Sequence, residues 1–241
     1  MLGAWSIVHS TESMVGAFFT AALAEHLALH GKRVLLFDLN ASSPAIDVYL
    51  GVSERVVYTL SDALRVSPED AVLSPQENLF FVPIGVGDGV DTVAPVTACI
   101  DSVSPDVVLL SAPRSALPLA ASVSDGLLLL TDASFVSLRA ASALASAHAF
   151  SGFVLSDLVL EREALRKMPA LTALSDAIGL PLVGILPHVD TNNPQTVAGK
   201  DFLSATENVA GRLLGESIPL LRGISLEGMR KRAFFERASH G

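Results

Sequence analysis

The chain of 241 residues contains a single cysteine, Cys99. It can therefore form no internal disulfide and no metal site built from several thiolates. Aromatic residues are also scarce, at 6%, although half of the chain is hydrophobic. The core must be aliphatic, and long aliphatic runs are typical of strands buried on both faces of a parallel sheet. A composition this apolar excludes a disordered chain.

Charge is sparse too, because 17% of the residues are charged and the net charge is −9. An acidic protein is poorly suited to non-specific contact with nucleic acid, so we expect no nucleic-acid partner. The most apolar stretch, residues 107–130, is interrupted by Arg114, Asp125 and two prolines. It falls short of the roughly 18 uncharged residues of a membrane-spanning helix. The first residues lack the basic region of a signal peptide, so we expect a cytoplasmic protein.

Short apolar runs alternate with helical patterns along the chain. Strands are predicted at residues 4–9, 33–38, 78–83, 107–111, 126–131, 153–157 and 183–186. Helices are predicted at residues 15–30, 44–50, 57–64, 134–150, 162–178 and 201–214. This alternation indicates an α/β fold: a mostly parallel twisted sheet with helices on both faces. We expect a single domain over residues 1–219 and a basic tail over 220–241, with any ligand site at the carboxyl ends of the strands.

The segment after the first predicted strand occupies the strand–loop–helix position of a P-loop. A phosphate cradle there needs glycines for close backbone approach, a lysine for the phosphate charge and a Ser or Thr hydroxyl for magnesium. Between Ser10 and Phe19 the chain has one glycine, Gly16, and no lysine. The residue types of a phosphate cradle are therefore missing at the position where the fold would place one.

Five further segments occur in an order that resembles the MinD/ParA family, the deviant Walker-A P-loop ATPases that position division sites and DNA cargo. Residues 38–51 resemble its DxD…LDxxLG segment, with Asn40 replacing the second acid. The other four segments resemble further patterns of the family. They are residues 57–64 (family pattern VVYDLxDVL), 106–113 (the family's Walker-B strand), 178–187 (family pattern LGIPLLGVIP) and 212–220 (the family's closing segment). The order covers nearly the whole chain and is closer to MinD than to ParA. The resemblance implies a MinD-like P-loop NTPase fold and, in the family, an ATP-bridged dimer.

The P-loop of that family reads KGGVGKTT, and this chain departs from it at most positions. The alignment is anchored on Val15 and Gly16. The two lysines of the family motif correspond to Glu12 and Ala17, and its first two glycines correspond to Ser13 and Met14. Its two threonines correspond to Phe18 and Phe19, and Ser10 and Thr11 precede the motif. The Walker-B aspartate becomes Ser111, and the adenine-side Asn-Arg falls near residues 156–157.

These departures bear on nucleotide binding. A charge-assisted hydrogen bond to a phosphate is worth roughly 1.5–3 kcal/mol. Both lysines are lost, and one of them is replaced by Glu12, whose negative charge repels phosphate. Phe18 offers no oxygen to magnesium. We expect no ATP or Mg²⁺ cofactor, no catalytic residue and no hydrolysis.

Simpler interpretations compete at several positions. Asp38 is either a remnant of the catalytic apparatus or a structural cap of the turn that follows its strand. Phe18 and Phe19 are expected to pack the first helix against the sheet. His9 and His188 follow strand ends near carboxylates, but their spacing does not favour a metal site.

The tail is the other candidate for a binding surface. Residues 222–241 hold five basic and two acidic residues. MinD-like proteins end in an amphipathic, lysine-rich membrane helix, and this tail resembles one loosely. The possible membrane contacts are Arg230, Lys231, Arg232, Phe234 and Phe235. Basic residues near an anionic surface contribute about 1 kcal/mol each, enough for weak peripheral binding; the alternative is a solvated terminus.

The resemblance and the departures together predict a MinD-like protein that does not hydrolyse nucleotide. We expect a binding, scaffold or regulatory partner in division-site placement or polar positioning. Its own partner would be a protein, either a second copy or an active MinD/ParA homologue that supplies ATP. One alternative is a divergent ATPase that still binds ATP through Gly16, Asp38 and Asn40. Another is an assembly module of a different machine, such as a flagellar or secretion apparatus.

Overall fold

The computed structural model describes residues 3–11, 14–86, 93–160, 164, 168–191 and 199–224. The chain divides into two compact units. The first comprises Met1–Leu127 and Thr191–Gln195, and the second Leu128–Asp190 and Thr196–Gly241. Each unit is described by itself.

The first unit is built on the aliphatic runs of the N-terminal half. Its strands are β1 (Gly3–His9), β2 (Val34–Asp38), β3 (Leu73–Gln76), β4 (Leu79–Val82) and β5 (Val107–Ala112), in the order β3-β4-β2-β5-β1. The pairs β1–β5, β2–β5 and β2–β4 are parallel, and β3 runs antiparallel to β4. Every residue of β2 and β5 is buried, which is why these strands are continuous apolar runs.

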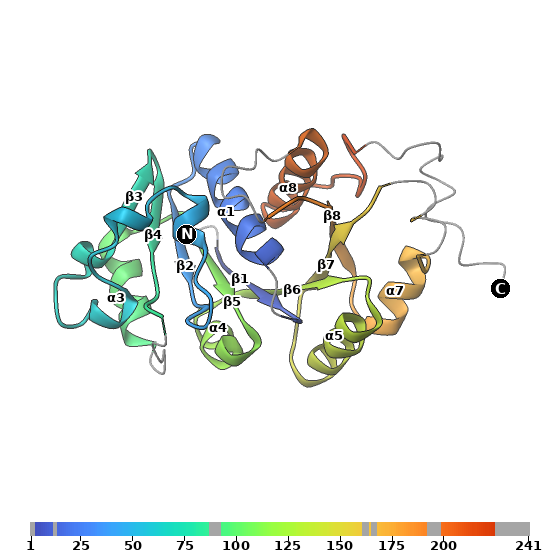
Figure 1. Cartoon of the computed structure of the whole chain (residues 1–241), viewed down its shortest axis with the longest axis horizontal. Coiled ribbons are helices and arrows are strands. Elements are labelled where there is room, and N and C mark those ends of the chain that lie inside the picture. Colours follow the sequence, from blue (N-terminus) through green and yellow to red (C-terminus); the bar gives the residue numbers. More distant parts are fainter. Residues whose placement is uncertain are drawn as a thin grey trace. The chain divides into compact units, whose positions relative to one another are not determined.

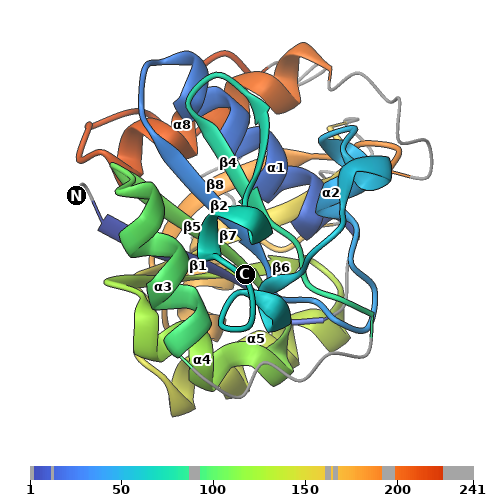
Figure 2. The ribbon, with the colours of Figure 1, turned by 90° about the vertical axis from the view of Figure 1, so that its left-hand side faces the viewer.

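Helices cover both faces of this sheet. They are α1 (Met14–Leu29), α2 (Ile46–Tyr49), α3 (Ala94–Val103) and α4 (Leu117–Val123), with 3₁₀ turns at Ser53–Arg55, Leu60–Asp62, Pro68–Ala71 and Arg114–Ala116. Helix α1 lies on one face, whereas α3 and α4 lie on the other (Figure 2). Right-handed crossovers between parallel strands produce this two-sided arrangement.

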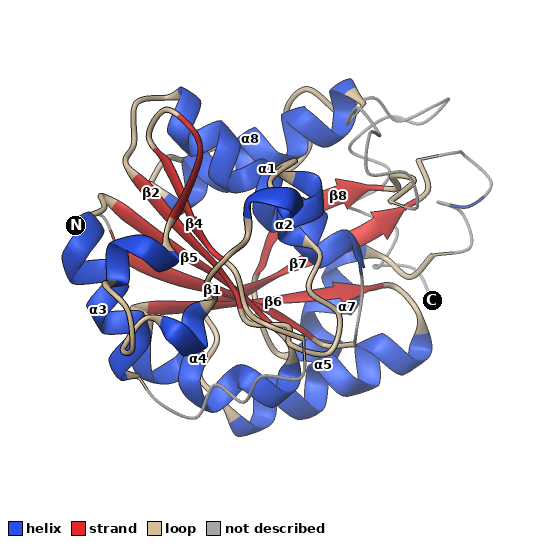
Figure 3. Cartoon of the chain, turned by 60° about the vertical axis from the view of Figure 1, so that its left-hand side comes forward, coloured by secondary structure: helices blue, strands red, loops and turns tan. Residues whose placement is uncertain are grey.

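The second unit repeats the pattern with parallel strands. Strands β6 (Gly126–Asp132, whose first two residues belong to the first unit), β7 (Gly152–Leu158) and β8 (Leu182–Pro187) follow one another in that order. Helix α8 (Lys200–Leu213) packs on one face of these strands, and α5 (Phe135–Ala147) and α7 (Leu171–Ile178) on the opposite face (Figures 1 and 3). The packing of α8 is tight: a Cβ at Gly184 of β8 would lie 2.3 Å from Val209.

The α/β class with a mostly parallel sheet and flanking helices is confirmed. The seven predicted strands are all present, but strand β3 and the α-helices α3 and α4 were not predicted. The predicted helix over residues 57–64 is wrong, because the chain there is extended up to Thr59 and then forms one 3₁₀ turn. Thr59 and Asp62 close a capping box around that turn.

Two further expectations concern helices. Helix α7 begins at Leu171, after an extended Ala170, and most of the earlier part of the predicted 162–178 helix lies outside the described residues. In the described part of the chain, no helix combines the length and the apolar character needed to cross a bilayer.

Candidate functional site

The P-loop position lies at the carboxyl ends of β1, β2 and β5 in the first unit. Asp38 at the end of β2 pairs in register with Ser111 of β5. The Oγ of Ser111 is 3.3 Å from Nε2 of His9, the last residue of β1. The parallel sheet thus brings three polar residues from distant parts of the sequence to one edge, where ligands bind in folds of this class.

His9 packs directly against Gly16. A Cβ at Gly16 would lie 2.5 Å from Cε1 and Nε2 of the imidazole, closer than real Cβ contacts come. His9 is 2% exposed, and burial lowers its pKa to about 4, so the ring is neutral at physiological pH. The glycine left in this P-loop position is therefore required for the close approach of a neutral histidine.

The positions aligned with the magnesium-side threonines hold buried phenyl rings. Phe19 is fully buried, and Phe18 meets Tyr49 of α2 edge-on, with ring centroids 5.1 Å apart at 72°. The Tyr49 hydroxyl donates to the carbonyl of Thr191 at 3.2 Å. The ring of Phe18 thus joins α1 to α2, and neither phenyl ring offers an oxygen to a metal ion.

Asp38 organises the turn between β2 and α2. One carboxylate oxygen accepts the N–H of Asn40 at 3.0 Å, and the other accepts those of Ala45 and Ile46 at 3.1 and 3.2 Å. Burial raises the pKa of this carboxyl, against the lowering effect of the three N–H donors, and Asp47 adds to the rise. Of the two interpretations of Asp38, the structure supports the structural cap.

The other predicted site residues differ in their environment. Val15 and Ala17 are buried in α1, whereas Met14 is 43% exposed. Ser10 is buried and Thr11 half-buried. Glu12, Ser13 and the tail residues Arg230, Lys231, Arg232, Phe234 and Phe235 lie outside the described residues.

The structure does not favour a metal site. Within the described ranges, no group of three or more His, Cys, Asp and Glu side chains could hold a metal ion. In the second unit, near the position that the resemblance assigns to the adenine side, Nδ1 of His188 lies 2.5 Å from Oδ1 of Asp157. These two side chains therefore partner each other.

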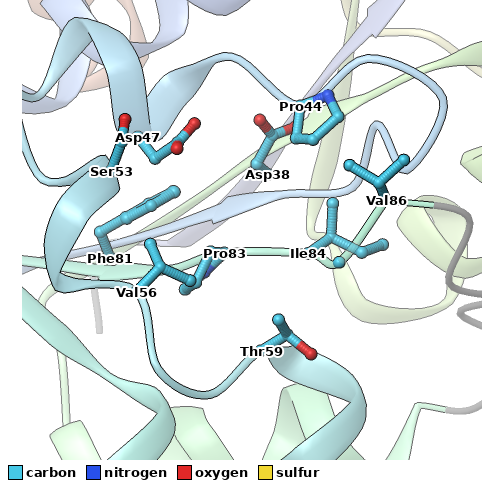
Figure 4. Close-up of a pocket in the computed structure, with 11 residues that line it drawn as sticks. Asp38, Pro44, Asp47, Ser53, Val56, Thr59, Phe81, Pro83, Ile84 and Val86 are labelled. Carbon is cyan, nitrogen blue, oxygen red and sulfur yellow. The ribbon is translucent and has the colours of Figure 1, made fainter.

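A cavity of about 340 Å³ adjoins Asp38, at the carboxyl ends of β2 and β4 (Figure 4). The carboxylates of Asp38 and Asp47 lie on one side of it, and Pro83 and Ile84 line the other. Two carboxylates beside an apolar wall are unfavourable for a phosphate. We did not predict this cavity; Asp47, nine residues after Asp38, was the available signal.

The comparisons with known proteins agree with this architecture. No protein-family model matches the chain. It is 25% identical to the septum site-determining protein MinD of Synechocystis sp. (strain ATCC 27184 / PCC 6803 / Kazusa) over 244 residues, covering 89% of this chain and 91% of that protein. It is 24% identical to the MinD of Thermotoga maritima over 243 residues, covering 89% of each.

Among solved structures, the MinC:MinD cell division protein complex of Aquifex aeolicus matches with a TM-score of 0.77 and 24% identity, over 90% of this chain and 97% of that chain. The likeness in sequence and the likeness in fold both extend over nearly the whole length. The chain is therefore similar to MinD proteins in sequence and shares their fold.

Proposed function

We propose that this chain is a MinD-like protein that has lost the nucleotide chemistry of its family and acts as a binding, scaffold or regulatory partner in division-site placement or polar positioning. The observation that carries the proposal is the contact between His9 and Gly16. In a phosphate cradle, such a glycine lets the backbone approach the ligand. In this chain it makes room for an imidazole.

The charges around this contact support the same conclusion. His9 is neutral, Ala17 replaces a lysine, and Phe18 replaces a magnesium-side hydroxyl. The oxygens of Asp38 are already engaged by three backbone N–H groups. A magnesium–triphosphate complex would therefore meet few of the charge-assisted bonds that hold it in a P-loop.

The partner that we propose is a protein. The solved A. aeolicus relative is a complex of MinD with MinC, which favours a protein-binding role for a chain of the same fold. The partner of this chain would be a second copy or an active MinD/ParA homologue. Without a bound nucleotide, its association would not depend on ATP.

Sedimentation tests this role. The purified chain, alone and mixed with an ATP-hydrolysing MinD from the same cells, would be run in the analytical ultracentrifuge with and without Mg-ATP. Phosphate release would be followed in parallel, with the homologue as the positive control. We expect no phosphate release by this chain and an association state of the chain alone that Mg-ATP leaves unchanged. ATP-dependent dimerisation of the chain alone would contradict the proposal and support the divergent ATPase.

We further propose weak contact of the tail with the inner face of the cell membrane. Residues 222–241 carry a basic excess that anionic lipid would attract. A larger fraction of the full chain than of a chain ending at residue 221 should co-sediment with anionic vesicles. Equal co-sedimented fractions of the full and the shortened chain would contradict this part of the proposal.

A further inference from the structure

Two histidines, His26 and His30, lie one turn apart at the carboxyl end of helix α1. Their rings are close neighbours, with centroids 4.2 Å apart and planes tilted by 34°. His30 is exposed and His26 is half-buried, so the pair is accessible from solvent. It is separate from His9 and His188, the histidines at the strand ends, and has no part in the proposed function.

The ring of His30 is held in one tautomer. Its Nδ1 lies 2.8 Å from the carbonyl oxygen of His26. Because a carbonyl only accepts, Nδ1 carries the proton in this contact, and Nε2 of the neutral ring keeps its lone pair. Histidines that bind metal ions almost always donate their other ring N–H in this way, often to a backbone carbonyl. His30 therefore has the hydrogen bond of a metal ligand that coordinates through Nε2.

The backbone that carries the pair ends in a Schellman motif. The N–H of Lys32 donates to the carbonyl of Leu27 at 3.1 Å, and the N–H of Gly31 donates to the carbonyl of Ala28 at 3.0 Å. Gly31 supplies the left-handed conformation that this motif needs, with a φ of 76°. Leu27 and Ala28 are buried in the core. The two imidazoles are therefore presented by a fixed turn.

The electrostatics of this helix end favour a cation, because the last turn of a helix carries the negative end of the helix dipole. Two basic residues follow the pair. The Nε of Arg33 donates to the carbonyl of Val103 at 2.8 Å, and its guanidinium lies 4.3 Å from the centroid of the Phe80 ring. Lys32 remains as a repelling charge, on a long side chain that extends readily into solvent.

We propose that His26 and His30 together bind a divalent transition-metal ion of the zinc and copper type. Residues four apart on a helix lie on one face, and imidazole nitrogen is a favoured ligand of both metals. The site requires only one of the two ring nitrogens of His26. No third His, Cys, Asp or Glu of the described residues joins the pair, so water fills the other coordination positions. The inference goes beyond the proposed partner role and does not depend on it.

Calorimetric titration with Zn²⁺ tests the pair. The variants are His26→Ala, His30→Ala and their combination, and the matched control is His148→Ala, which removes an exposed histidine outside the pair. We expect a saturable site in the wild type and in His148→Ala, and at least tenfold weaker binding in each single variant of the pair. The double variant should bind little more weakly than either single one, because a chelate needs both imidazoles. Circular dichroism would verify that each variant is folded.

Two further measurements locate and identify the ion. In NMR spectra, Zn²⁺ should shift the ring signals of His26 and His30 together and leave that of His148 unchanged. Cu²⁺ should bind more tightly than Zn²⁺, as the order of affinities of divalent metals predicts. Ca²⁺, which takes oxygen ligands, should not bind to the pair.

Equal affinities of the wild type, His26→Ala and His30→Ala for Zn²⁺ would overturn the inference. Losses in the two single variants that simply add in the double variant would also overturn it, because they would show two independent imidazoles. Binding of Ca²⁺ as tight as that of Zn²⁺ would have the same meaning. None of these results affects the proposed partner role, because that role is tested with Mg-ATP.

Discussion

The imidazole of His9 occupies the space that a side chain at position 16 would need, with Cε1 and Nε2 both 2.5 Å from an ideal Cβ on Gly16. The end of β1 and the first turns of α1 are thereby held together by a contact within the protein. In a P-loop, the same strand–loop–helix position is built around phosphate. The contact explains why a glycine is present here although lysines and threonines are absent.

Gly16→Ala should destabilise the fold by about 1–3 kcal/mol, because the added methyl overpacks a buried site. Urea denaturation followed by circular dichroism would measure the loss. In the His9→Ala background, where the imidazole is gone, the same substitution should cost less than half as much. A cost independent of residue 9 would show that the two side chains do not compete for space.

Asp38→Asn should also destabilise the protein. An amide oxygen replaces two carboxylate oxygens that accept three backbone N–H groups, and an unsatisfied buried donor costs about 1–3 kcal/mol. Asp47→Asn is the control, because no hydrogen bond from another described residue to its carboxylate holds the turn, and we expect a change within about 0.5 kcal/mol. Equal stabilities of the two variants would argue against the capping role of Asp38.

Stability should fall on acidification through the titration of His9. Its pKa is lowered from 6.5 to about 4 in the folded protein, so the unfolded chain takes up the proton first as the pH falls. The stabilisation is complete above pH 6.5 and is lost between there and about pH 4, by about 3 kcal/mol at most. The raised pKa of Asp38 acts in the opposite direction, so the comparison must isolate His9.

The comparison is with His9→Gln, whose unfolding free energy lacks this dependence. The difference in stability between wild type and variant should shrink from pH 7 to pH 4. A constant difference across that range would contradict a buried neutral histidine.

Much of the fold could be predicted because local sequence patterns determine many of its helices and strands. The fully buried strands β2 and β5 are aliphatic runs, and Ser134 caps α5 through the N–H of Ser137. Strand β3 was missed because it is four residues long and contains a proline. Helix α3 was missed because small and polar residues weaken its apolar pattern.

The site was predictable only in part. The absence of lysines could be read directly from residues 10–19. The contact between His9 and Gly16, the cavity beside Asp38 and the choice between two roles for Asp38 depend on tertiary packing. The hydrophobic periodicity that identifies a helix or a strand carries no information on contacts between distant parts of the sequence.

The most direct measurement is calorimetric titration of the purified chain with Mg-ATP, beside the MinD of T. maritima. We predict no saturable heat for the wild type at nucleotide concentrations that saturate the relative, because residues 14–19 offer neither a lysine nor a magnesium ligand. A variant with Glu12→Lys, Ala17→Lys and Phe18→Thr should also fail to bind, as His9 remains against Gly16. Micromolar binding of Mg-ATP by the unmodified chain would contradict the central claim.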